Sequence, residues 1–86
     1  MVVGFQRSAD VIAFEYLSQL EAQMRQSGTI NSSDYETIIE AIGEVGGYDA
    51  VRKLIEIRGE FASQDFTNHP VYELLIKAIG RAGRSR

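Results

Sequence analysis

The sequence has no cysteine and no tryptophan, and it has one proline and one histidine. Without cysteine, no disulfide can hold the fold together and no thiolate can bind a metal. The same absence fits a reducing compartment. One histidine cannot supply the several ligands that a zinc site needs. We therefore expect neither a metal nor another cofactor.

Long apolar runs are also missing. No stretch approaches the roughly 18 apolar residues that a membrane span requires, and residues 1–6 are too few for the apolar core of a secretory signal. We therefore expect no membrane association and no targeting segment within this chain. Its 86 residues allow one small domain. An apolar content of 44% and a charged content of 24% are typical of a folded globular chain.

Negative charge prevails, but it is unevenly distributed. The net charge of -3 excludes a cationic field over the whole molecule. Lys77, Arg81, Arg84 and Arg86 nevertheless place +4 in the last ten residues, so the other 76 residues carry -7. Two interpretations stay open: a solvated basic tail, or an end of the chain that contacts phosphate groups.

Apolar residues recur every three or four positions, as on one face of a helix. This spacing predicts four helices, near 10–27, 33–46, 48–62 and 70–82, and a helical remnant at 1–8. The residues expected on the inner side of the third helix are Val51, Leu54, Ile55 and Phe61.

The expected helix ends carry suitable residues. Ser33 and Glu36 have the spacing of a capping box, in which each side chain satisfies a free backbone amide. Gly46-Gly47 breaks the second helix and allows a tight hairpin with the third. Pro70 suits the first turn of the fourth helix, where its missing N–H costs nothing.

An internal repeat is the most informative feature. When the sequence is shifted by 37 residues, eight of the sixteen positions in 31–46 are identical to those in 68–83. The identical pairs are Asn31/Asn68, Tyr35/Tyr72, Glu36/Glu73, Ile39/Ile76, Ala41/Ala78, Ile42/Ile79, Gly43/Gly80 and Gly46/Gly83. A fixed period in this range is typical of solenoids. We therefore predict an all-α, α-α superhelix of about two helical hairpins, with a partial repeat at the N-terminus.

The repeat divides the single predicted domain, 1–86, into three parts: the end of one repeat (1–31), a central repeat (32–68) and the start of the next (69–86). We interpret the chain as a piece of a longer array, or as a small protein that relies on a neighbour to cover its ends. Apolar residues at those ends should then drive self-association into a homo-oligomer. They are Phe5, Ile76 and Ile79.

Two equivalent pairs lead to further expectations. Gly43 and Gly80 should lie at close helix crossings, where a side chain would not fit. Tyr35 and Tyr72 either pack between helices or stack on nucleic-acid bases, and packing is the simpler interpretation.

The residues resemble a known family. Tyr35–Gly46 and Tyr72–Gly83 are similar to the first helix of a pentatricopeptide repeat (PPR): a Tyr, an aliphatic pair, a small residue, another aliphatic residue and a closing Gly. Tyr48–Ile55 resembles the start of its second helix, so the resemblance covers nearly the whole chain. The tetratricopeptide repeat, with a period of about 34, fits less well.

The resemblance implies a superhelix that lays single-stranded RNA along a groove, mostly in chloroplasts and mitochondria, during RNA processing, stabilisation or translation. In that family, two positions per repeat read the base. They correspond to Asn31 and Asn68, which suit the role, and to Glu36 and Glu73, which depart from the family's small polar residues. The period of 37 also exceeds the family's usual one.

Phosphate contacts would come from Lys77, Arg81 and Arg84. Our leading hypothesis is therefore organellar RNA binding. The alternative is a protein-interaction scaffold, a subunit of an organellar RNA-handling complex. Glu36, Glu73 and the net charge of -3 favour this alternative, because carboxylates repel a polyanion.

The sequence offers little support for a metal site or a catalytic site. His69 precedes a proline and suits a helix cap or the surface better than a ligand role. Glu36 and Glu40 lie one helical turn apart, so they form either a cation-binding pair or a solvated acidic face. Ser32 and Ser33 lack the His and Asp partners that a nucleophile needs. We expect no enzymatic activity.

Overall fold

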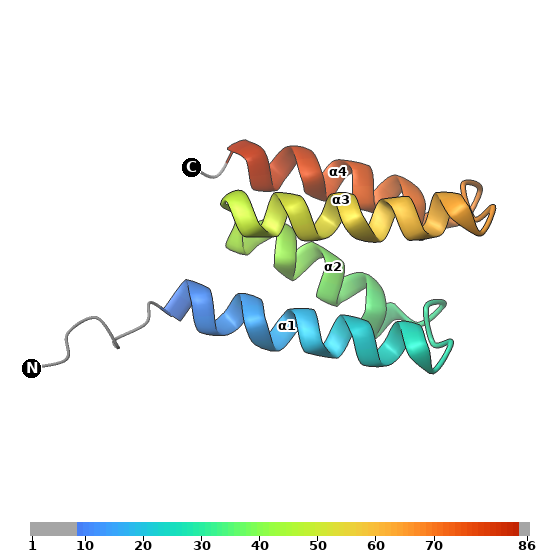
Figure 1. Cartoon of the computed structure of the whole chain (residues 1–86), viewed down its shortest axis with the longest axis horizontal. Helices are drawn as coiled ribbons and strands as arrows, with labels where there is room; N and C mark the ends of the chain where they lie inside the picture. Colours follow the sequence, from blue (N-terminus) through green and yellow to red (C-terminus); the bar gives the residue numbers. More distant parts are fainter. Residues whose placement is uncertain (1–8, 85–86) are drawn as a thin grey trace, which may run out of the picture.

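The computed structural model describes residues 9–84, which fold into four helices (Figure 1). They are α1 (Ala9–Gln26), α2 (Ser33–Val45), α3 (Tyr48–Ser63) and α4 (Pro70–Arg84). α1 packs on α2, and α4 packs on both α2 and α3. The described chain contains no strand, so the all-α class is confirmed. Each predicted helix agrees within two residues at either end, whereas the remnant predicted at 1–8 lies outside the described residues.

α2 begins at Ser33, as predicted, but its capping residue differs from the prediction by one position. Ser32, not Ser33, is the cap, and its hydroxyl accepts a hydrogen bond from the N–H of Tyr35 at 3.2 Å. Ser32 has an extended backbone (φ -85°, ψ 154°), which points its side chain at the free amides of the first turn. Ser33 is already helical, so it cannot serve in this way.

Glycine makes the turn between α2 and α3, as predicted. Gly46 and Gly47 have φ values of 70° and 90°, which side-chain-bearing residues rarely adopt. The N–H of Gly47 also donates to the carbonyl of Ala82 at 3.3 Å, which fixes the turn against the last part of α4. Pro70 is the first residue of α4, again as predicted.

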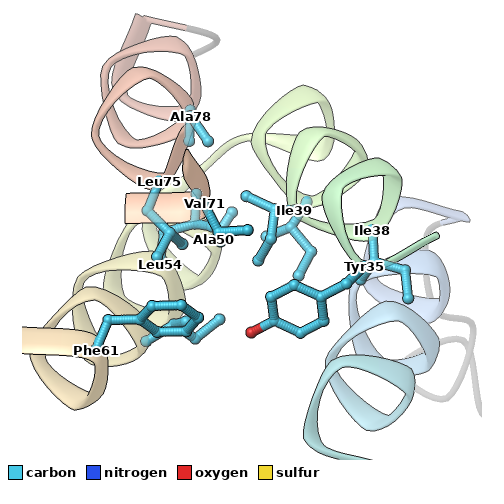
Figure 2. Close-up of a cluster of buried hydrophobic side chains, with 12 residues drawn as sticks. Tyr35, Ile38, Ile39, Ala50, Leu54, Phe61, Val71, Leu75 and Ala78 are labelled. Carbon is cyan, nitrogen blue, oxygen red and sulfur yellow. The ribbon is translucent and has the colours of Figure 1, made fainter. Parts of the chain in front are cut away.

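The core lies between α2, α3 and α4 (Figure 2). Its buried side chains include Tyr35 and Ile39 from α2, Leu54 from α3 and Leu75 from α4. α1 adds only half-buried apolar side chains to this core; they are Phe14, Leu17, Leu20 and Met24. The uneven burial makes α1 the least anchored of the four helices.

One inward residue of α3 was predicted wrongly. Ile55 is 47% exposed, whereas Ile57 is fully buried. The buried positions of α3 are Ala50, Leu54, Ile57 and Phe61, spaced by four, three and four residues. Ile55 follows Leu54 directly, and one residue turns a helix by about 100°, which takes its side chain off the buried face.

The two equivalent glycines have different surroundings. A Cβ atom on Gly43 would lie 3.1 Å from the Cβ atom of Ala78 and 3.2 Å from its carbonyl oxygen. α2 and α4 therefore cross closely at Gly43, as predicted. The same prediction is wrong for Gly80, where only the Arg84 guanidinium comes within 4 Å, at 3.8 Å. In the described chain, no helix covers that face of α4.

Candidate binding surface

A buried carboxylate joins the first three helices. Glu21 of α1 is fully buried, and its Oε2 atom accepts hydrogen bonds from the Tyr35 hydroxyl (2.6 Å) and from Arg25 Nε (2.7 Å). Lys53 Nζ of α3 lies 3.9 Å from Oε1. A buried charge is tolerated only with such partners. The cluster therefore fixes α1 against α2 and α3.

Tyr35 and Arg25 each keep one charge state in this cluster. Burial and the hydrogen bond to Glu21 raise the pKa of Tyr35 far above its usual range. The hydrogen bond from Arg25 to Glu21 raises the pKa of the Arg25 guanidinium. Tyr35 thus stays neutral and Arg25 stays charged in the folded protein, which suits a structural cluster rather than an acid–base catalyst.

The second repeat unit makes the equivalent contact with a different partner. Arg58 Nη1 donates to the Tyr72 hydroxyl at 2.9 Å. Arg58 and Tyr72 follow Glu21 and Tyr35 by 37 residues each. Tyr35 is buried and stacks on Phe61, with ring centroids 6.3 Å apart. The expectation that these tyrosines pack between helices is confirmed.

The loop before α2 is joined to the start of α4 by two polar side chains. Asn31 Oδ1 lies 2.5 Å from His69 Nε2, and His69 Nδ1 accepts from the N–H of Val71 at 3.1 Å. Because Nδ1 accepts, Nε2 carries the ring proton and donates to Asn31. His69 is therefore a helix cap, as expected. Asn31 and its equivalent Asn68 are both exposed, and the Asn31 amide is bonded to His69.

The outer side of α4, together with one residue of α2, forms an open pocket of about 540 Å³. Its lining residues are Glu40, Leu74, Ile76, Lys77, Ala78, Gly80, Arg81 and Arg84. The three predicted phosphate-binding residues are thus brought together. They share the site with carboxylates, because Glu40 lines the pocket and Glu44 Oε2 lies 3.1 Å from Arg81 Nη1.

The four predicted base-reading residues do not join this site. Glu36 is half-buried and Glu73 is exposed, each in the first turn of its helix, and neither lines the pocket. Asn31 lines a separate pocket of about 360 Å³, whose wall includes Phe66. Asn68 lines neither. The structure thus separates the predicted base readers from the predicted phosphate contacts.

Sequence reasoning missed the buried cluster and part of the apolar surface. Ile76 was expected to be an uncovered apolar residue, and it is 50% exposed and lines the pocket, whereas Leu74, which also lines it, was not singled out. The signal for Glu21 was present: it lies within the apolar series of α1, four residues before Arg25. An acid at such a position is buried only when partners surround it.

Comparison with family models, curated proteins and solved structures finds no match to this chain. Residues 9–84 contain no helix long and apolar enough to cross a membrane. They also contain no group of three side chains placed to hold a metal ion.

Proposed function

We propose that this chain is a non-catalytic helical-repeat scaffold that binds a protein partner on the outer side of α2 and α4. The pocket described above carries this proposal. Its lining combines the apolar Leu74 with the acidic Glu40 and the basic Lys77 and Arg84. Such a mixed surface suits a peptide segment that offers an apolar side chain and an acidic residue.

Single-stranded RNA is the second candidate, because Lys77, Arg81 and Arg84 line one pocket. The pentatricopeptide superhelix and the chloroplast or mitochondrial location, which the resemblance implies, go with either candidate. Three contacts weigh against it. Glu40 and Glu44 place negative charge beside the cations, and the Asn31 amide is bonded to His69. A polyanion on this surface would meet repulsion as well as attraction.

A peptide library displayed on phage tests the scaffold proposal. We expect the selected peptides to combine an apolar residue with an acid. The double variant Lys77→Glu/Arg84→Glu should then bind them at least about tenfold more weakly, a loss of about 1.4 kcal/mol. Arg52→Glu is the matched control, because this exposed residue lies on α3 beside Tyr48 and outside the pocket. Equal losses in both variants would contradict the proposed site.

A random single-stranded RNA pool, titrated at low and moderate salt, tests the second candidate. Two or three phosphate contacts predict a log–log salt slope of about -1.4 to -2.1. Arg81→Ala should weaken binding to all sequences alike, whereas Asn68→Ala should change base preference. RNA binding of this kind, with no peptide selected, would overturn the scaffold proposal. No RNA binding at low salt would remove the second candidate.

A further inference from the structure

One face of α4 repeats a face of α2 but lacks its partner. On α2, Ile39 is fully buried and Gly43 meets Ala78 of α4. At the equivalent positions of α4, Ile76 is 50% exposed and Gly80 meets no other helix. α4 therefore presents an uncovered helix-docking face, and the α2–α4 contact shows which kind of helix it fits.

The α2–α4 contact sets two requirements for a helix that docks on the uncovered face of α4. Ala78 supplies the small side chain that lies against Gly43, and Arg81 pairs with Glu44. If the next helix of the stack packed on α4 as α4 packs on α2, it would need a small residue opposite Gly80 and an acidic residue opposite Arg81. A second α4 would place arginine against arginine, so it does not fit.

α2 itself meets both requirements. Its residues equivalent to Ala78 and Arg81 are Ala41 and Glu44. On the side of α2 that carries Ala41, Thr37 is exposed and Ala41 is half-buried, whereas the equivalent Ala78 is buried, so among the described residues this side is less covered than its counterpart on α4. α2 of another molecule can therefore reach the uncovered face of α4.

We propose, on the basis of the scaffold function above, that the protein partner of this surface is a second copy of this chain, which docks head to tail with its α2 on the uncovered face of α4. Its α1 then lies beside α4, as α3 lies beside α2. Ala41 of the second copy packs on Gly80, and Glu44 of the second copy approaches Arg81. A guanidinium has five N–H donors, so Arg81 can serve a carboxylate on each side.

Charge complementarity supports this occupant. The exposed edge of α4 carries Lys77 and Arg81, and the same edge of α2 carries Glu40 and Glu44 at the equivalent positions. Successive copies would therefore alternate acidic and basic edges along the stack. The contact is heterologous and does not close, so it generates chains rather than a closed dimer.

Sedimentation velocity over a range of protein concentrations tests the proposal. The wild type should grow in mass with concentration, and added salt should reduce the growth. Gly80→Leu blocks the α4 face, and Ala41→Leu blocks the α2 face. Each variant alone should stay monomeric. Circular dichroism at low concentration verifies that each is folded; Gly80 has open space for a side chain.

The mixture of the two variants is decisive. Gly80→Leu retains a free α2 face and Ala41→Leu retains a free α4 face, so together they should form a one-to-one dimer that grows no further. A wild type that stays monomeric at every concentration would overturn the proposal. So would assembly that persists in both single variants, or a mixture that stays monomeric while the wild type assembles.

Discussion

At the scale of single residues, the contacts of Glu21 show how two similar repeat units diverge. Equivalent tyrosines bond to an acid in one unit and to a base in the other. Glu21 is fully buried and Arg58 is only half-buried. Removing a donor from a buried carboxylate exposes an unmet desolvation cost, whereas a half-buried guanidinium can turn to water. The two hydroxyls should therefore contribute unequally to stability.

Tyr35→Phe should lower the free energy of unfolding by about 1–3 kcal/mol, because Glu21 loses its 2.6 Å donor without access to water. Tyr72→Phe is the matched control at the equivalent position. It should cost less than about 1 kcal/mol. Urea denaturation of both variants measures the difference, and equal losses would contradict the role given to the buried carboxylate.

Alkaline pH should destabilise the wild type through the same hydroxyl. The folded-state pKa of Tyr35 is raised above the unfolded value of 10.0. Above about pH 10 the unfolded chain loses this proton while the folded protein keeps it. The stabilisation is thus complete below about pH 10 and falls as pH rises, by up to about 1.4 kcal/mol per unit. Tyr35→Phe should lack this fall, and Tyr16→Phe, at an exposed site, should retain it.

At the scale of helices, local signals in the sequence predicted that each helix exists and where it begins and ends. They did not predict for every helix which side chains are buried. Glycine at 46 and 47, proline at 70 and the three-four spacing act within a few residues, so they can be recognised without a structure. Ile55 and Ile57 are chemically alike and continue two overlapping series, one from Val51 and one from Leu54, so only the packing of α3 on its neighbours decides which one is buried. Ser32 and Ser33 are likewise indistinguishable until the backbone is known.

The crossing of α2 and α4 leads to a prediction for the two equivalent glycines. Gly43→Leu should destabilise the protein by about 1–3 kcal/mol, because its Cβ meets Ala78 at 3.1 Å. Gly80→Leu should stabilise the monomer by up to about 1 kcal/mol, since leucine favours helix and has room there. Thermal unfolding at low protein concentration compares them. Unchanged stability in Gly43→Leu would refute the close crossing.

At the scale of the whole molecule, the candidate surface was only partly predictable. The basic residues 77, 81 and 84 are spaced by four and three, so one helix face was enough to group them. Their acidic neighbours come from α2, and no local pattern reveals which side chains of another helix lie opposite. The same holds for Asn31, which is engaged by His69, 38 residues away. The composition of the site therefore depends on contacts between helices, which patterns within one helix do not predict.

Stability should also vary across the molecule, with α1 as its weak edge. In a stack of repeat units, each helix depends on its immediate neighbours. α1 packs on α2 through half-buried apolar residues and through the Glu21 cluster. Hydrogen exchange should therefore show lower protection for α1 amides than for those of α2, α3 and α4.

Glu21→Ala separates this local effect from global stability. The variant removes the acceptor shared by Tyr35 and Arg25, and it should reduce α1 protection by roughly 1–3 kcal/mol, because the buried hydroxyl loses its partner. Gln19→Ala, at an exposed position of the same helix, is the control. α2, α3 and α4 should keep most of their protection in Glu21→Ala, since the fully buried apolar side chains of the core all come from these three helices. Uniform loss of protection across all four helices would instead show that the described chain unfolds as one unit.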